Sequence, residues 1–174
     1  MGSVDFSKVR ELDHALRQDF LRWRPEYRTV VAAVCYRRQA NGEVEFLLVR
    51  TRAGRWTFPK GGVDGDATSA DAAAREAYEE AGVHGRVEAL AFTWYLHSKK
   101  RDAHTVIAHL CEVVSLDAPL EDYRAPRWFS AGKAKQRLRE ERLSPYVEEL
   151  ERVVDDALRR VVELDSQESL LPLS

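Results

Sequence analysis

Two runs of apolar and β-branched residues near the start of the chain predict a pair of strands. The first run, TVVAAVCYRR, begins at Thr29, and the second, VEFLLVRT, begins at Val44. Between them stands Asn41-Gly42, a dipeptide that is typical of a two-residue hairpin turn. The pattern therefore predicts an antiparallel hairpin over this part of the chain.

A loop and a helix are expected next. Glycines are frequent from Gly61 to Gly65, which indicates a loop. Thr68 can cap a helix, with Asp71 at the last position of the capping box, and Gly82 can end that helix. A stripe of small side chains would allow the helix to lie close to a sheet: Ala70, Ala73, Ala74, Ala77 and Ala81.

The second half of the chain repeats the strand pattern and then becomes helical. The runs RVEALAFTWYL, from Arg86, and TVIAHLCEVV, from Thr105, flank the polar turn SKKRDA and predict a second hairpin. A short RWF strand leads into two helices, of which the last begins at Ser144-Pro145 and is followed by a mobile polar tail after Leu164. One apolar stripe of that helix must pack on its own domain or across a dimer axis: Tyr146, Val147, Leu150, Val153, Val154, Ala157, Leu158 and Val161.

The N-terminus and the cysteines bear on where the protein works. Residues 5–22 carry apolar side chains at steps of three and four, which predicts an amphipathic helix that Pro25 ends. This segment lacks the apolar core of a signal peptide, and no apolar run of the chain is long enough to cross a membrane. Cys35 and Cys111 fall in apolar strands, where thiols are typically small buried hydrophobes. We therefore expect a cytoplasmic protein with no membrane partner.

Composition and charge narrow the class of ligand. The chain has 174 residues, of which 44% are hydrophobic and 32% charged, and this balance is typical of one folded domain with terminal extensions. A formal net charge of -2 gives no general attraction to nucleic acid or to an anionic membrane. A polyanionic ligand is then expected to be a small molecule that local basic clusters hold.

Three glutamates in the helix expected after Thr68 are candidates for chemistry. Glu76, Glu79 and Glu80 are three and four residues apart, so their carboxylates lie along one face of the helix. Like charges in this arrangement repel each other, and a hard divalent cation that prefers oxygen ligands, such as Mg²⁺, would offset the repulsion. For such a triple taken alone, an ordinary charged helix end is the alternative interpretation.

The residues before the glutamates change that balance. The segment GGVDGDATSADAAAREAYEEAGV, from Gly61, resembles the Nudix box G-x5-E-x7-R-E-U-x-E-E-x-G-U, in which U is apolar. The upstream WTFPKGG also resembles the Nudix hydrolases. One position departs from the box, because Ala67 replaces a glutamate that in the family mainly ties the loop to the box arginine, here Arg75. The neighbouring Asp66 is expected to pair with Arg75 in its place.

The resemblance implies a fold and a division of the chain. The implied fold is the Nudix α/β/α sandwich with a mixed β-sheet, over residues 27–142. An N-terminal helical extension over 1–26 and a C-terminal amphipathic helix with a polar tail over 143–174 lie outside it. Arg75 and Gly82 are the structural residues of the box in this interpretation.

The resemblance also implies metal-dependent hydrolysis of a phosphoanhydride bond by water. Glu76, Glu79 and Glu80 would hold Mg²⁺ or Mn²⁺, and a carboxylate would remove a proton from the attacking water. Glu76 is the first choice for that base. Some family members take the base or a further ligand from beyond the box, where Glu121 and Asp122 are candidates and a solvated acidic turn is the alternative.

Glycines and basic residues near the box are candidates for binding the substrate. Gly61 and Gly62 allow a phosphate to approach the backbone closely, and Lys60 adds a positive charge. Any single basic residue is more typical of a solvated surface, but two clusters together favour a substrate with several phosphates. These clusters are Arg50, Arg52 and Arg55, and Lys99, Lys100 and Arg101.

Three further segments resemble one branch of the family. RWTFPKGGV, KKRDAHT and EDYRAPRWFS are similar to the hydrolases of dinucleoside polyphosphates and diphosphoinositol polyphosphates, which implies that His104 lies near the substrate. Trp94, Tyr95 and Trp128 are candidates for stacking a base, although aromatic residues in strands usually fill a core. Nucleotide-pool sanitising, nucleotide-sugar hydrolysis and ligand sensing without catalysis are the alternative functions, and a homodimer is a further option.

Overall fold

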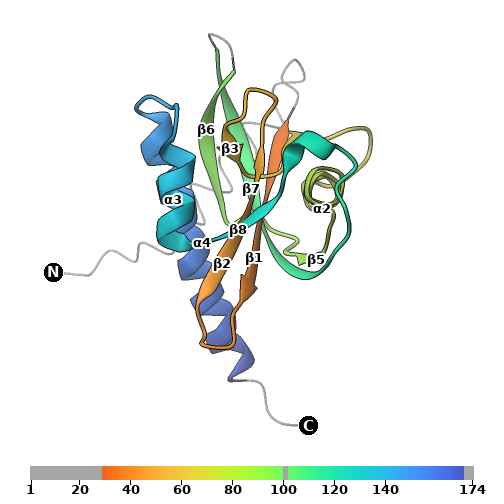
Figure 1. Ribbon diagram of the computed structural model, residues 1–174. Helices are drawn as coiled ribbons and strands as arrows, with labels where there is room; N and C mark the ends of the chain where they lie inside the picture. The colour runs from red at the N-terminus through yellow and green to blue at the C-terminus, as the bar shows by residue number, and fades with distance from the viewer. Residues whose placement is uncertain (1–28, 100–101, 171–174) are drawn as a thin grey trace, which may run out of the picture.

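The computed structural model describes residues 29–99 and 102–170, which form an eight-stranded sheet with helices on both faces (Figure 1). The helix predicted over residues 5–22, and the extension over 1–26 that contains it, lie outside the described residues. In chain order the described elements are β1 (Val30–Arg38), β2 (Val44–Arg50), β3 (Trp56–Thr57), β4 (Lys60–Gly62), α2 (Ser69–Ala81), β5 (Val83–Val87), β6 (Thr93–Lys99), β7 (Asp102–Leu116), the 3-10 helix η1 (Asp122–Arg124), β8 (Arg127–Ser130), α3 (Ala131–Arg139) and α4 (Tyr146–Glu168).

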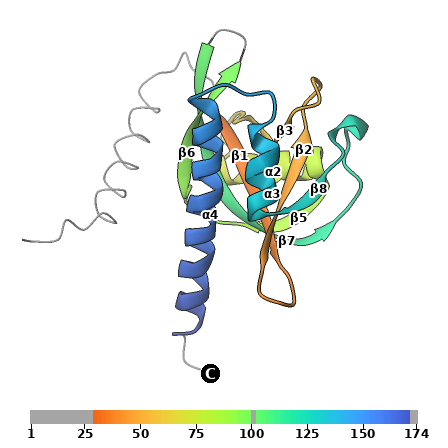
Figure 2. The same ribbon diagram turned by 60° about the vertical axis from the view of Figure 1, so that its left-hand side comes forward.

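The sheet is mixed, with strand order β3-β2-β1-β7-β5. β1 pairs in parallel with β7 and antiparallel with β2 and β4, while β6 pairs with β7 and β8 with β2. Both predicted hairpins are confirmed, and Gly42 has the positive φ, 86°, that the first turn requires. Because α2 covers one face and α3 and α4 the other, the predicted α/β/α sandwich is also confirmed (Figures 1 and 2).

β1 is buried on both faces, which explains its uninterrupted apolar sequence. Successive side chains of a strand point to opposite sides, and those of β1 enter two separate hydrophobic clusters. Val31, Ala33 and Cys35 lie in the cluster under α2, and Ala32, Val34 and Tyr36 in the cluster under α3 and α4. The central strand thus fixes the position of α2, and with it the glutamates, relative to the rest of the sheet.

α2 begins and ends where the sequence predicts. The Thr68 hydroxyl accepts a hydrogen bond from the Asp71 amide at 3.1 Å, and Gly82 ends the helix in the left-handed conformation with φ 68°. The alanine stripe is wrong at two positions, since Ala74 is exposed and Ala70 only half-buried. The side of the helix that faces the sheet includes the buried Glu80, and its small residues are Ala72, Ala73, Ala77 and Ala81.

Two strand predictions need correction. The run from Arg86 is not one strand, because β5 ends at Val87 and β6 begins at Thr93, with an exposed Leu90 between them. Both strands pair with β7, so the chain passes from one part of that long strand to another. The expected loop at Gly61 to Gly65 begins as β4, since its first two glycines pair with Val31 and Val30 of β1.

α4 packs against its own domain. Its buried residues, Leu150, Val153, Val154, Ala157 and Val161, share one hydrophobic cluster with β1, β2, β6 and β7. Two details differ from the prediction: the helix begins at Tyr146 without a side-chain cap, and it continues through the expected polar tail to Glu168. Among the described residues, no helix is long and apolar enough to cross a membrane.

Candidate active site

Glu80 is a buried carboxylate at the inner side of α2. Its side chain is only 8% exposed, and it forms an ion pair of 2.7 Å with the guanidinium of Arg124. The other oxygen accepts a hydrogen bond of 3.3 Å from the backbone amide of Lys60 in β4. Burial raises the pKa of Glu80 to about 7, against the opposing charges of Arg124 and Lys60. Glu80 therefore joins α2 to β4 and to η1.

Glu76 lies one turn earlier and packs against Gly61. A Cβ added to Gly61 would lie 2.1 Å from Oε1 of Glu76, so a side chain at this position would collide with the carboxylate. Burial raises the pKa of Glu76, and the nearby negative charge of Glu79 raises it further. Gly61 is needed here because it has no side chain, which leaves room for the Glu76 carboxylate, and not because of its conformational freedom.

Arg75 holds the loop that follows β4. Its guanidinium donates to the carbonyl oxygen of Gly62 at 2.7 Å and lies 3.6 Å from the carboxylate of Asp64. The predicted partner, Asp66, is exposed and forms no ion pair with Arg75. Gly65, with φ 59°, turns the chain between these two acids, and Asp64 is the one left facing the arginine.

Arg124 was not predicted, and it connects the two groups of acidic residues. Its guanidinium binds Glu80 at 2.7 Å and Glu121 at 2.5 Å. Glu121 also accepts a hydrogen bond of 2.7 Å from the Tyr123 hydroxyl, which lowers the pKa of its carboxyl, while Asp122 is exposed. Glu121 and Asp122 were the candidates in this segment, but its arginine is the residue that contacts the box helix, through Glu80.

Several of the predicted phosphate-binding residues lie near Glu80 or its partner Arg124, which donates to the carbonyl oxygen of Arg50 at 3.2 Å. Arg50 stacks on the ring of Trp56 at 3.9 Å, and Arg52 lies 4.8 Å from the ring of Tyr123. Lys60 donates from Nζ to Thr57 at 3.0 Å, and burial lowers its pKa to about 8. His104 stands opposite a second histidine of the β6–β7 pair. Side chains from 98 to 103, which include Lys99, Lys100 and Arg101, lie outside the described part of the structure.

The aromatic candidates have other contacts. Tyr95 is fully buried in the cluster under α4. The guanidinium of Arg37 lies 4.2 Å from the ring centroid of Trp128, and that of Arg152 lies 5.9 Å from the ring centroid of Trp94. Stacking of a base on any of the three stays a prediction.

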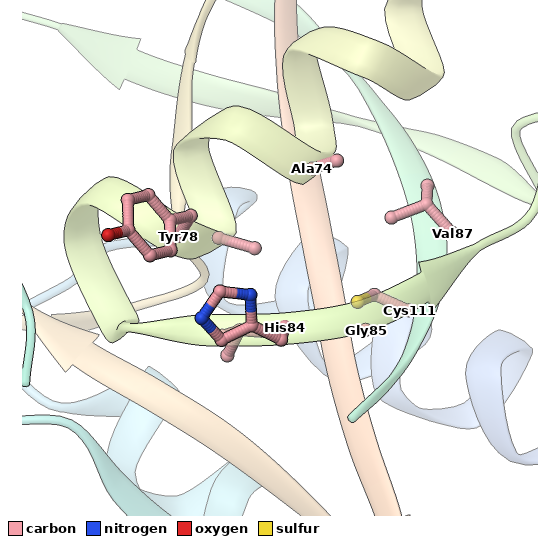
Figure 3. A pocket seen from close by; sticks show the side chains of 8 residues that line it. Ala74, Tyr78, His84, Gly85, Val87 and Cys111 are labelled. Atoms are coloured by element: carbon pink, nitrogen blue, oxygen red, sulfur yellow. The ribbon is translucent and has the colours of Figure 1, made fainter. Parts of the chain in front are cut away.

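A pocket of about 290 Å³ opens beside α2, away from the glutamates (Figure 3). Its walls come from the outer side of α2 and from β5, with the thiol of Cys111 at the bottom. Tyr78 and His84 lie at its mouth, their rings 5.2 Å apart. Because none of the box glutamates lines it, this pocket is not the candidate site.

The comparison with protein families decides the assignment. The model described as "NUDIX domain" matches residues 27–150, which include α2 and its three glutamates. The chain belongs to this family. Nudix hydrolase 21, chloroplastic, from Arabidopsis thaliana is 34% identical over 118 residues, which are 62% of this chain and 58% of that protein. Diphosphoinositol polyphosphate phosphohydrolase 2 from Rattus norvegicus is 28% identical over 64% of this chain and 63% of its own.

Solved NUDIX structures share the fold. An Ap4A hydrolase from C. elegans, solved as a binary complex, superposes with a TM-score of 0.64 at 20% identity, covering 79% of this chain and 99% of that one. The chain spans less than two thirds of the length of the relatives named above. Together, these comparisons establish the family and the fold of this chain.

NUDIX hydrolases generally use divalent metal ions, and the donor set of this chain fits one by its chemistry. Three carboxylates on one helix supply the oxygen ligands that such an ion prefers. Their charges also repel one another, because the charge of Glu79 raises the pKa of Glu76 and the charge of Glu76 raises the pKa of Glu80. Of these carboxylates, Glu80 is held by Arg124, and Glu76 packs on Gly61. Within the described ranges, no group of at least three acidic, histidine or cysteine side chains is placed to hold an ion.

We expect Gly61→Ala to displace the Glu76 carboxylate and to lower turnover, with little change in stability. The new methyl group would overlap the carboxylate, which stands at the end of a flexible side chain and can turn away from it. Gly132→Ala is the matched control, since nothing lies within 4 Å of its added Cβ. Denaturant unfolding and a turnover assay measure the effects, and equal behaviour of the two variants would contradict the contact with Glu76.

Proposed function

We propose that the chain is a pyrophosphohydrolase that cleaves a phosphoanhydride bond in a small molecule, with Mg²⁺ or Mn²⁺ held by Glu76, Glu79 and Glu80. When bound, the cation supplies positive charge that neutralises the leaving phosphate and makes the attacking water more acidic. The observation that supports the proposal most is the NUDIX match, because it spans the helix that carries all three glutamates.

The described residues divide the remaining work among them. Glu76, which lies against the backbone of Gly61, takes the proton of the attacking water in this proposal. Arg124 orients the Glu80 carboxylate through their ion pair. Lys60, at the start of β4, adds a positive charge near Glu80. Glu121 acts through Arg124, since the arginine lies between it and Glu80.

A dinucleoside polyphosphate or a diphosphoinositol polyphosphate is the substrate class we favour. One relative from Rattus norvegicus is named for the second class, and the structural neighbour from C. elegans for a member of the first. Nucleotide-pool sanitising and nucleotide-sugar hydrolysis are the alternative functions. Both cleave the same kind of phosphoanhydride bond and differ only in the group attached to the phosphates. A ligand sensor without catalysis would not need the three glutamates.

A substrate panel tests the proposal directly. Purified protein would be incubated with diadenosine polyphosphates, diphosphoinositol polyphosphates, nucleotide sugars and nucleoside triphosphates, with Mg²⁺, with Mn²⁺ or with chelator. We expect cleavage of one class in the presence of metal and none with chelator. A folded protein that turns over no member of the panel would contradict the hydrolase and favour the sensor.

Assembly and location complete the proposal. We take the protein to be cytoplasmic, with no nucleic acid as partner, although relatives with chloroplastic and mitochondrial names exist. The apolar stripe of α4 is used inside its own domain, so a homodimer would need another surface. Light scattering after size exclusion at high concentration measures this, and a strictly monomeric species would remove the homodimer.

A further inference from the structure

A second cavity, of about 110 Å³, is lined by residues of β6 and of the connection between α3 and α4. Three basic side chains from distant parts of the chain line it, and we call it the basic pocket: Arg55 precedes β3, His97 belongs to β6, and Arg142 belongs to the connection. Its other lining residues are Leu96, Glu141, Leu143, Tyr146 and Leu150. Apolar and ionisable residues thus share the walls of the pocket, and three of the ionisable ones are basic.

The arginines of the basic pocket form no ion pair with a described residue. Arg142 donates to the carbonyl oxygens of Leu138 at 2.8 Å and Trp56 at 2.7 Å, and these neutral groups hold it in place. In the part of the chain that the structure describes, neither Arg55 nor Arg142 has a carboxylate within 4.0 Å. Burial, together with the charge of Arg55, lowers the pKa of Arg142 to about 10. A bound anion would offset this unbalanced charge.

Two more polar groups, Tyr95 and His97, interact electrostatically with Arg142. The hydroxyl of Tyr95 is buried without a hydrogen bond to any described residue, although buried polar groups normally have one. Burial, together with the charges of Lys60 and Arg142, lowers the pKa of His97 to about 3, so its ring is neutral at pH 7 and keeps one N–H donor. Donors of this kind match a ligand that is rich in acceptor oxygens.

The basic pocket is close to the proposed catalytic glutamates. A short chain of hydrogen bonds links the two: Arg142 donates to the carbonyl oxygen of Trp56 at 2.7 Å, and the ammonium of Lys60 donates to the hydroxyl of the next residue, Thr57, at 3.0 Å. The backbone amide of Lys60 in turn donates to the Glu80 carboxylate at 3.3 Å. The basic pocket and the box helix are therefore connected through the segment from Trp56 to Lys60.

We infer that the basic pocket binds a phosphate group of the substrate other than the one at which water attacks. The inference rests on the proposed function and narrows it to substrates that carry an additional phosphate. Arg55 and Arg142 present planar guanidinium groups, which bind phosphate oxygens in pairs. Glu141 also lines the pocket and is exposed; its negative charge offsets part of the charge of Arg142. The cavity has room for several water molecules, and so for one phosphate group.

The test measures binding without catalysis. Isothermal titration calorimetry would follow inorganic tripolyphosphate binding to the whole chain with chelator present, so that no hydrolysis takes place. Arg55→Met removes a side chain that has no hydrogen bond to a described residue, and we expect it to weaken binding by about tenfold or more. Arg55→Lys keeps the charge and should lose only a few-fold. Arg127→Met, at an exposed position of β8, is the control for total charge and should bind like the original chain.

The outcomes separate this inference from the proposed function. Equal binding by Arg55→Met and Arg127→Met, or no binding by the unaltered chain, would overturn the basic pocket as a phosphate site. Displacement of tripolyphosphate by uncharged adenosine would do the same and assign the cavity to a base. In turnover assays of an active substrate, Arg55→Met should raise KM by about tenfold and change kcat little, because the arginine binds away from the bond that breaks. A chain that hydrolyses nothing would leave the binding result intact.

Discussion

Glu79→Gln should lower the metal-dependent turnover number by about 100-fold or more while the fold stays intact. Glu79 is half-buried, and its side chain has no hydrogen bond or ion pair to another described residue. Replacing its carboxylate by an amide removes a negative charge from the proposed cation site and breaks no internal contact. Glu80→Gln is less clean, because it would weaken the ion pair that Arg124 forms with a buried group.

The control for this variant is Glu168→Gln, the same chemical change at the exposed end of α4. Its turnover and its dependence on Mg²⁺ concentration should match those of the unaltered chain. Metal titration of activity and circular dichroism measure both variants. If Glu79→Gln kept full turnover with unchanged metal dependence, the assignment of the box glutamates as cation ligands would be wrong.

The sequence predicts the fold well because local signals and burial agree. Asn41-Gly42, the Thr68 capping box and Gly82 each specify a local backbone geometry, and the structure has all three. The errors arise where tertiary pairing decides. Leu90 sits in a continuous apolar run, yet it is exposed because β5 and β6 pair with different parts of β7. The local sequence pattern of a strand does not predict which part of its partner strand it will pair with.

The site is only partly predictable for a related reason. The spacing of Glu76, Glu79 and Glu80 places them on one helix, but it gives no information on what faces them. Arg124 lies 44 positions after Glu80 in the chain, and only the return of η1 to α2 brings the two together. Arg142 and His97 meet in the same way, from the α3–α4 connection and from β6. Such contacts depend on topology, so residue types alone did not single these basic groups out.

Gly82→Ala should cause the largest loss of stability, about 3 kcal/mol of unfolding free energy. Two costs add at this residue. Its φ of 68° is unfavourable for alanine, and the new Cβ would lie 1.9 Å from the carbonyl oxygen of Asp117. That oxygen belongs to the backbone of Asp117. The backbones of Gly82 and Asp117 are already in close contact, because the Asp117 amide donates a hydrogen bond to the carbonyl oxygen of Gly82 at 2.7 Å. The segment that leads to η1 would have to move.

Gly65→Ala separates the two costs, because Gly65 also has a positive φ, 59°, but nothing lies within 4 Å of its added Cβ. We expect it to lose only about 1 kcal/mol, the cost of the left-handed conformation alone. Chemical denaturation of both variants gives the difference between them. Equal losses would mean that the contact with Asp117 carries no cost. If instead Gly82→Ala loses more and also lowers turnover, then the junction of α2 with the segment from Asp117 to η1 is what keeps Arg124 beside Glu80, and stability and catalysis depend on the same backbone contact.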